Sequence, residues 1–222
     1  MFKIAIDGPS GSGKSTLAKR LSAELGFVYV DTGALYRAIG LFVYRAKIDP
    51  KDAVAVEAVL PEISVSIKYI SGEQKTFLGN EDVSSDIRLP EISMYASAVS
   101  AIPAVRAFLL GLQRDIIRSN NVIMDGRDIG TVIMPDANVK IFLISNNETR
   151  AQRRCEELLE KGVQTTYEEV LADLEKRDAN DSSRAVAPLT PAPDATFLDN
   201  SLFTPDQTFA RALEIIRERI DV

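Results

Sequence analysis

The chain of 222 residues, 45% of them hydrophobic, is long enough to bury the core of one α/β domain, and its formal net charge of −6 argues against broad binding to nucleic-acid polymers. It has no histidine, which excludes histidine-dependent triads, histidine general bases and histidine-rich metal sites. The single cysteine, Cys155, excludes an internal disulfide and a multi-cysteine zinc site. We expect no signal peptide, because Asp7 interrupts the first apolar run, and no apolar stretch approaches about 18 residues.

The chain starts with a predicted strand over residues 2–7 and a predicted helix over residues 16–25, joined by a glycine-rich loop. The loop matches the pattern G-x-x-x-x-G-K-[ST] and consists of Gly8, Pro9, Ser10, Gly11, Ser12, Gly13, Lys14 and Ser15, followed by Thr16. Backbone N–H groups of such a loop surround nucleotide phosphates, while Lys14 bridges phosphate oxygens and the Ser15 hydroxyl is placed to ligate Mg²⁺. A glycine-rich turn with an exposed lysine is the alternative, but the order of strand, loop and helix favours a nucleotide-binding loop.

A second predicted strand over residues 27–30 is followed by three polar candidates, Asp31, Thr32 and Arg37. Ligands of open α/β sheets bind at the carboxyl ends of the strands, so these residues are candidates for a binding site. Two alternatives stay open here. Asp31 and Thr32 could form an ordinary N-cap of the next helix, and Arg37 could be a solvated side chain.

The pattern of apolar and polar residues changes after residue 62. Apolar and polar residues alternate over residues 63–70, and a turn then leads to residues 76–78, so we expect a small antiparallel insert. Helical spacing returns over residues 89–119 with a break near Pro103. The helices beside this break carry Ser97 and Arg106, which are by themselves more typical of surface residues than of ligands.

A third predicted strand over residues 122–125 ends in Asp125, and Arg127 and Asp128 follow it. An apolar run that ends in aspartate is the usual partner of a phosphate loop, where the carboxylate holds Mg²⁺ directly or through water. Asp125 could equally orient a neighbouring arginine, or the segment could be an ordinary loop. The residues themselves do not choose between these roles.

A fourth predicted strand over residues 139–144 leads into a charged helix over residues 147–161. A second helix follows Thr166, which has capping-box spacing with Glu169, and ends near residues 177–184. Two helices with a loop at the tip suit a mobile lid. A solvated helical hairpin with i,i+4 ion pairs is the alternative.

One more strand and one more helix complete the predicted elements. The strand covers residues 197–199, after a proline-punctuated stretch over residues 188–193. The helix is expected to have Thr204 at its N-cap, Pro205 at its first position and Gln207 at its third, the arrangement of a capping box.

Taken together, four segments make the chain resemble the bacterial cytidylate kinases over essentially its whole length. They are the phosphate loop at residues 8–16, D-T-G-A-L-Y-R at 31–37, D-G-R-D-I-G-T at 125–131 and R-A-V-A-P-L at 184–189. The resemblance implies an α/β, P-loop NTPase-type three-layer fold with a parallel central sheet, a small antiparallel insert that binds a nucleoside monophosphate (NMP), and a helical lid.

The resemblance also implies one NMP-kinase domain over residues 1–222. Its core is expected at about residues 1–60, 89–148 and 194–222. The NMP-binding insert is expected at about residues 61–88, and the lid at about residues 149–193.

The implied activity is transfer of the γ-phosphoryl group of ATP, with Mg²⁺, to CMP or dCMP. Four residues are implied to lie near the cytosine ring: Thr32, Ser97, Arg106 and Asp128. Three arginines are implied to bind the acceptor phosphate: Arg37, Arg127 and Arg184. Arg177 and Asp181 match positions that meet the sugar hydroxyls, and Arg177 could also face the transferring phosphate. The residues expected to act in catalysis are Lys14, Arg127, Arg177 and Arg184, and Asp31 and Asp125 are counted among the substrate-binding residues.

Physical chemistry makes the implied role of Asp128 sensible. A carboxylate accepts a hydrogen bond from the N4 amino group of cytosine, whereas it is repelled by O4 of uracil. A buried group left unpaired by the wrong base costs about 1–3 kcal/mol, so Asp128 could discriminate between the bases.

Three rival functions share this fold. They are a kinase for another small acceptor, a GTPase switch and an ATP-binding scaffold without transfer activity. The switch is disfavoured because no N-K-x-D guanine signature is present. We expect a cytoplasmic monomer that acts on ATP and CMP or dCMP and binds neither a nucleic-acid polymer nor a membrane.

Overall fold

The computed structural model describes residues 1–118, 120–160 and 162–222, which divide into two compact units. One unit comprises Met1–Tyr29 and Asn120–Val222, and the other comprises Val30–Ser119. The chain therefore leaves the first unit after Tyr29 and returns to it at Asn120.

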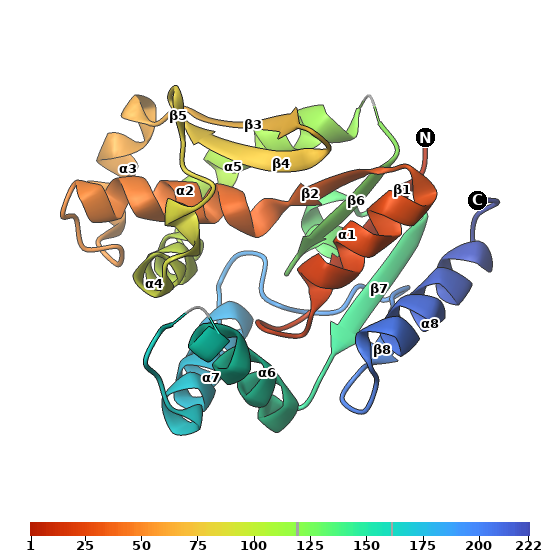
Figure 1. Cartoon of the computed structure of the whole chain (residues 1–222). Helices are drawn as coiled ribbons and strands as arrows, with labels where there is room; N and C mark the ends of the chain where they lie inside the picture. The colour runs from red at the N-terminus through yellow and green to blue at the C-terminus, as the bar shows by residue number, and fades with distance from the viewer. Residues whose placement is uncertain (119, 161) are drawn as a thin grey trace. The chain divides into compact units, whose positions relative to one another are not determined.

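The sheet of the first unit has the strand order β2-β6-β1-β7-β8 in the described residues (Figure 1). Its strands are β1 (Lys3–Asp7), β2 (Val28–Asp31), β6 (Val122–Gly126), β7 (Val139–Ile144) and β8 (Thr196–Asp199), of which β2 carries the chain into the second unit. Strand β1 pairs in parallel with β6 and β7, and Asp7 lies opposite Gly126 and Phe142. Since parallel strands end at one edge, the loops after β1 and β6 lie beside each other.

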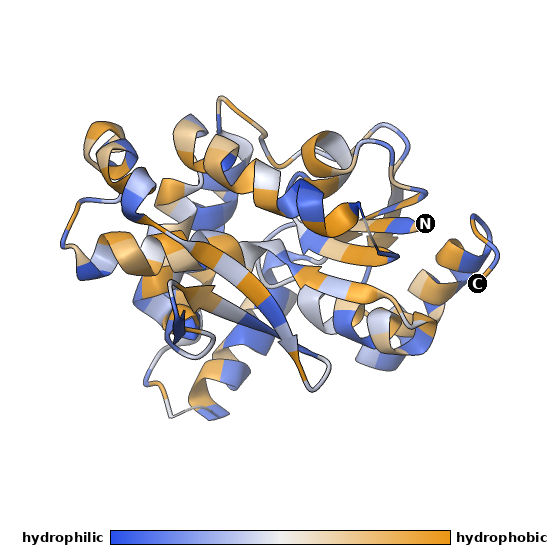
Figure 2. Ribbon diagram, turned by 90° about the horizontal axis from the view of Figure 1, so that it is seen from above, coloured by the Kyte–Doolittle hydropathy of each residue, from blue (hydrophilic) through white to orange (hydrophobic). Residues whose placement is uncertain are grey.

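Helices α1 (Lys14–Leu25) and α8 (Pro205–Arg217) bury their apolar sides in one core with the sheet. Leu21 and Ile216 are fully buried in this core together with Ile4 and Ile123. The hydropathy colours of Figure 2 show apolar and polar residues on the same helices, as expected of helices with one buried face. Helices α6 (Asn147–Glu160) and α7 (Tyr167–Ser182) share a smaller core that includes Cys155. Cys155 is thus a packing residue.

The second unit packs helices against a three-stranded sheet in the order β3-β4-β5. Its helices are α2 (Thr32–Arg45), α3 (Ala53–Val59), α4 (Pro90–Val99) and α5 (Pro103–Ile117), with short 3₁₀ helices η1 (Leu60–Glu62) and η2 (Asp86–Arg88). The strands are β3 (Val65–Ile70), β4 (Glu73–Leu78) and β5 (Glu81–Asp82), and their pairing is antiparallel. The predicted antiparallel insert is confirmed as a sheet.

Most predicted elements are confirmed, with shifts of one or two residues at their ends. Helix α1 begins at Lys14 rather than at residue 16, because the last residues of the phosphate loop already have helical geometry. The capping boxes at Thr166 and Thr204 are both present. Ser119 and Lys161, the last residues of two predicted helices, lie outside the described residues. The π-helix η3 (Ile129–Ile133), α3 and β5 were not predicted.

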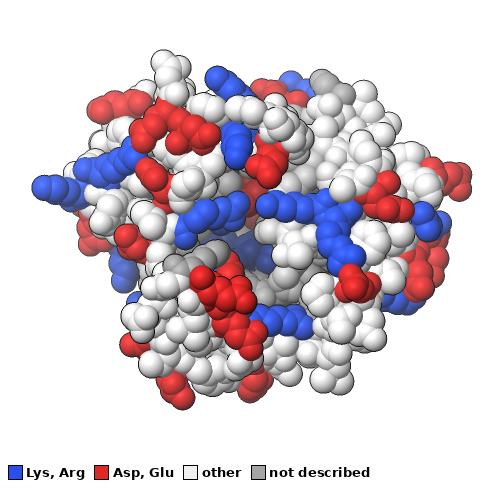
Figure 3. Space-filling view, in the orientation of Figure 1, with Lys and Arg blue, Asp and Glu red and all other residues white. Residues whose placement is uncertain are grey.

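Charges of both signs are interspersed on the face shown in Figure 3, rather than gathered into one continuous basic surface. In the described part of the chain, no single helix has the length and hydropathy of a membrane span. Helices α4 and α5 have the length and hydropathy of a membrane span only when they are taken together, and the pair is bent by 100°.

Candidate functional site

The phosphate loop leaves β1 through a backbone that only glycine tolerates. Gly8 has a φ of +150°, and a Cβ there would lie 2.1 Å from the carbonyl oxygen of Leu143. Gly13 has a φ of +89° and is the N-cap of α1. The N-terminus of α1 therefore opens into the loop, and the N–H groups of such a helix end favour the binding of an anion.

Lys14 is buried in this loop. Its Nζ donates a hydrogen bond to the Pro9 carbonyl oxygen at 2.6 Å and lies 3.3 Å from Ser12 Oγ. Burial, and next the charge of Arg127, lower the pKa of Lys14 to about 7, although Asp125 and Asp7 oppose this shift. A polyphosphate at the loop would stabilise the charged ammonium and raise this pKa again.

Asp125 lies at the end of β6 and accepts hydrogen bonds from two hydroxyl groups. Ser15 Oγ donates at 2.8 Å, and the Tyr29 hydroxyl donates at 2.9 Å. Asp125 is 4% exposed. The structure thus brings the predicted Mg²⁺ ligand, Ser15, next to the carboxylate that ends the third predicted strand.

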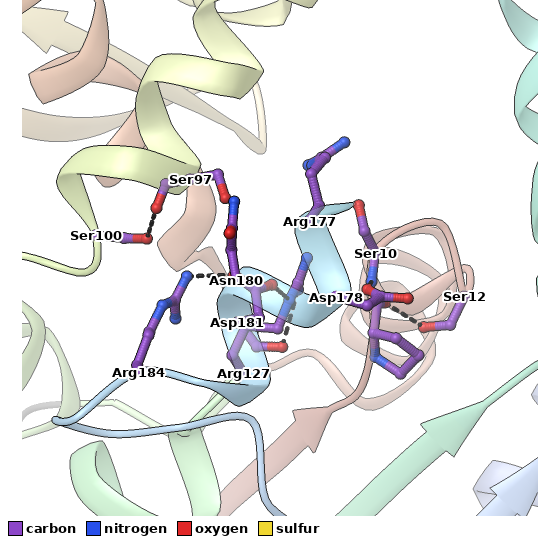
Figure 4. A network of polar contacts seen from close by, with 12 residues as sticks. Ser10, Ser12, Ser97, Ser100, Arg127, Arg177, Asp178, Asn180, Asp181 and Arg184 are labelled. Carbon is purple, nitrogen blue, oxygen red and sulfur yellow. Dashed lines mark hydrogen bonds and ion pairs between the residues drawn. The ribbon is translucent and has the colours of Figure 1, made fainter. Parts of the chain in front are cut away.

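An arginine cluster surrounds Asp181 on helix α7, in the segment expected to form the lid (Figure 4). Arg127 Nε donates to Asp181 at 2.7 Å, and Arg184 donates to the other carboxylate oxygen. Burial opposes ionisation of Asp181, but Arg127 and Arg184 together hold its pKa below the ordinary value. Arg177, on the same helix, has an i,i+4 ion pair with Asp173 at 3.8 Å. This last contact is of the kind expected for a helical hairpin.

A second carboxylate on α7 contacts the phosphate loop itself. Asp178, which lies beside Ser10 (Figure 4), accepts from the Ser10 N–H at 3.1 Å. It also accepts from Arg150 Nη1 at 2.5 Å. Arg150 Nη1 also donates to the Ser10 carbonyl oxygen at 2.7 Å. Helices α6 and α7 are therefore fastened to the loop through Ser10.

In the second unit, Asp31 is the N-cap of α2, the alternative that the sequence left open, and it also pairs with two arginines. One of its oxygens accepts from the Ala34 N–H at 2.9 Å and caps α2. The other accepts from Arg37 at 2.7 Å and from Arg88 at 3.1 Å. Burial would raise the pKa of Asp31, but Arg37 and then Arg88 lower it below its usual range. The carboxylate therefore holds two arginines beside the start of α2.

Ser97, Arg106 and Thr32 are buried, with 8%, 8% and 3% of their surfaces exposed. The expectation that Ser97 and Arg106 are surface residues is therefore wrong, because both lie on the buried sides of α4 and α5. Arg106 lies 5.5 Å from the centre of the Tyr36 ring and donates to the Ser100 carbonyl oxygen at 3.3 Å. Ser97 Oγ has no hydrogen-bond partner among the described residues, which leaves its hydroxyl available to a ligand.

Residues 4–218 match the family model described as cytidylate kinase. The chain belongs to the cytidylate kinase family. A curated cytidylate kinase of Fervidobacterium nodosum is 46% identical over 98% of this chain and 97% of the relative. One of Caldanaerobacter subterraneus subsp. tengcongensis is 49% identical over 97% of this chain and 95% of the relative. A solved structure of an uncharacterized protein from Eubacterium ventriosum, 13% identical, covers 99% of this chain and 100% of that protein with a TM-score of 0.52, which supports the fold alone.

Sequence reasoning about this member of the cytidylate kinase family missed several polar residues near the predicted ones. They are Asp7, Tyr29, Arg88, Arg150 and Asp178. The only sign that the sequence offered for these residues was their position beside predicted site residues. Asp7 and Tyr29 lie in strands next to motif residues, and Asp178 follows Arg177. None belongs to a motif with a recognisable spacing.

Proposed function

We propose that the chain transfers the γ-phosphoryl group of ATP to CMP or dCMP, giving ADP and CDP or dCDP. The observation that carries the proposal is the hydrogen bond from Ser15 to the buried carboxylate of Asp125 at a phosphate loop, in a chain of the cytidylate kinase family. In this proposal the loop, residues 8–16, binds the phosphates of ATP, and Lys14 bridges them.

The residues at the loop fit the magnesium ion that such a reaction uses. Mg²⁺ prefers oxygen ligands and is commonly held by one or two protein oxygens together with nucleotide phosphates. Ser15 supplies such an oxygen, and Asp125 orients the Ser15 hydroxyl by accepting a hydrogen bond from it. The described residues contain no group of three or more carboxylate, histidine or cysteine side chains that could hold a metal ion. When bound, the ion would neutralise phosphate charge.

The acceptor phosphate is proposed to bind to arginines that now contact carboxylates. Arg127 and Arg184 contact Asp181, and Arg37 and Arg88 contact Asp31. A dianionic phosphate offers these guanidinium groups stronger acceptors with matching geometry. We therefore add Arg88 to the proposed phosphate ligands.

The remaining acceptor roles follow the resemblance. Asp128, Thr32, Ser97 and Arg106 are proposed to contact cytosine, and Arg177 and Asp181 to contact the sugar. The loose transition state of phosphoryl transfer needs charge stabilisation and positioning, which the lysine and the arginines supply without a histidine. Lid closure would exclude water from the reaction. The monomeric state and the cytoplasmic location stay predictions.

The proposal is tested by measuring ADP release from Mg·ATP without an acceptor and then with CMP, dCMP, UMP, AMP or GMP. We expect acceleration mainly by CMP and dCMP. A better rate with UMP or AMP would contradict the cytosine assignment, and no acceleration by any of them would contradict the kinase reaction itself.

Asp128→Asn should reduce the preference for CMP over UMP. The carboxylate accepts from the cytosine amino group and repels O4 of uracil, whereas an amide can donate to O4. We expect the ratio of kcat/KM for CMP to that for UMP to fall about tenfold or more, the factor expected for loss of one charge-assisted hydrogen bond. Steady-state kinetics with both acceptors measures the ratio, and an unchanged ratio would remove Asp128 from base recognition.

Tyr29→Phe should weaken the use of Mg²⁺ without affecting the acceptor. The variant removes only the hydroxyl that donates to Asp125 at 2.9 Å, so the carboxylate that orients Ser15 is held less firmly. We expect the Mg²⁺ concentration for half-maximal rate to rise about threefold to tenfold, a scale set by one hydrogen bond to a charged group. The matched control is Tyr44→Phe, whose side chain is 43% exposed. Equal Mg²⁺ dependence in the two variants would contradict the role of Tyr29.

A further inference from the structure

The carboxylate of Asp7 joins the phosphate loop to the segment that carries Arg127 and Asp128. Asp7 is the last residue of β1 and precedes Gly8 directly. Its Oδ1 accepts from the Ile129 N–H at 2.8 Å, and its Oδ2 accepts from the Gly130 N–H, also at 2.8 Å. Both oxygens are therefore used on backbone groups that follow Asp128.

These two N–H groups are the first donors of the π-helix η3. The first N–H groups of a helix lack partners inside it, and the N-cap side chain usually supplies one. Asp128 is the N-cap of η3, yet within the described residues its side chain makes no cap hydrogen bond. Asp7 performs that function from another strand.

The packing around these bonds leaves little room for adjustment. Asp7 is 4% exposed and Asp128 is 3% exposed. A Cβ at Gly130 would lie 3.3 Å from Asp7 Oδ2 and 3.1 Å from Cδ of Lys140. The turn after Asp128 is thus held between β1 and β7 at one position.

We propose that Asp7 is a positioning residue that sets Asp128 and Arg127 for the acceptor nucleotide relative to the phosphate loop. The inference rests on the proposed function, since it assigns the base-reading role to Asp128. Asp7 acts through the backbone of Ile129 and Gly130.

The electrostatics of Asp7 support this role. Burial raises its pKa to about 6, the neighbouring carboxylate of Asp128 acts in the same direction, and Lys14 and the two N–H groups oppose it. Lys140 on β7 is the further charged group packed at this turn. Since the native state binds this proton more tightly than the unfolded chain, stability from this group falls as pH rises from about 4 to 6. A carboxylate whose charged form is disfavoured by burial, as here, is typical of functional sites.

The test is the ratio of kcat/KM for CMP to that for UMP in wild type, Asp7→Asn and Thr204→Ala, from about pH 5 to pH 8. Both acceptors carry the same 5′-phosphate, so its titration near pH 6 cancels in the ratio. In Asp7→Asn the amide NH₂ opposes one N–H donor of the turn. We expect the ratio to be about tenfold lower and independent of pH, while the wild-type ratio falls below pH 6. Thr204→Ala loses the cap of α8 and controls for a loss of stability alone.

The outcomes separate this inference from the proposed function. A wild-type protein without a preference for CMP would contradict the proposed function itself. A wild-type preference that Asp7→Asn retains within twofold would overturn the role of Asp7. If Asp7→Asn does not fold, the wild-type pH profile decides, because a ratio that is constant from about pH 5 to pH 8 overturns the inference as well.

Discussion

Arg184→Met should lower kcat by a factor of about 10³–10⁵, the range known for an arginine that stabilises the charge of a transferring phosphoryl group. The side chain of Arg184 is 4% exposed and donates to Asp181, so its guanidinium group is a desolvated cation. A desolvated guanidinium acts on developing phosphate charge more strongly than a solvated one, because the local dielectric constant is lower. Steady-state rates at saturating ATP and CMP measure the effect.

Two further variants show whether the loss is catalytic. Arg184→Lys keeps the charge but not the planar fork, and we expect it to recover only a small part of the rate. Arg211→Met removes an exposed arginine that pairs with Glu214 at 2.8 Å, and we expect kcat to stay within about twofold of wild type. If Arg184→Met kept a rate within tenfold of wild type, the proposed catalytic role of this arginine would be wrong.

Lys14→Met should lower kcat/KM for ATP by about 10²–10³, as expected when a preorganised charged donor is removed from an active site. The buried ammonium now donates to Pro9 O, and we expect it to exchange this carbonyl for phosphate oxygens when ATP binds. Kinetics at varied ATP concentration, with saturating CMP, measure the change. A KM for ATP and a kcat both close to those of wild type would contradict the assignment of this lysine.

The same substitution has a second, pH-dependent consequence for stability. The pKa of Lys14 is lowered from 10.5 in the unfolded chain to about 7 in the native protein. Between these values the unfolded state binds more protons, so the stability contributed by this group rises with pH from about 7 to 10.5. We therefore expect Lys14→Met to unfold at higher urea concentration than wild type near pH 7, with a difference that shrinks toward pH 10.5. A difference that grows with pH would show that burial does not destabilise the charged lysine.

Local patterns in the sequence were sufficient for much of the fold and for the phosphate loop. The loop motif, the buried strands around it and the capping boxes at Thr166 and Thr204 depend on residues only a few positions apart. Such interactions form within one segment, so they can be recognised without the rest of the chain. The resemblance then supplied the family, which the match over residues 4–218 confirms.

Burial and long-range partners could not be predicted in the same way. Taken alone, the local sequence around Ser97 and Arg106 favoured the surface, and only the resemblance placed them near a base, yet both side chains are buried in the second unit. Asp31 accepts a hydrogen bond from Arg88, a partner 57 positions further along the chain that was not predicted. Which face of a helix is buried, and which charges meet there, depends on how whole elements pack.

The sequence by itself determined that this protein has a phosphate loop followed by a helix. The glycines, Lys14 and Ser15 that define this loop lie within eight consecutive residues, 8–15, so the motif can be recognised without the rest of the chain. Only the tertiary structure decided that Asp7 caps the turn after Asp128, across 122 positions, and that Asp178 reaches Ser10 across 168 positions. Such contacts join strand ends and helices that parallel pairing and core packing bring together, and neither residue of a pair carries a local sign of its partner.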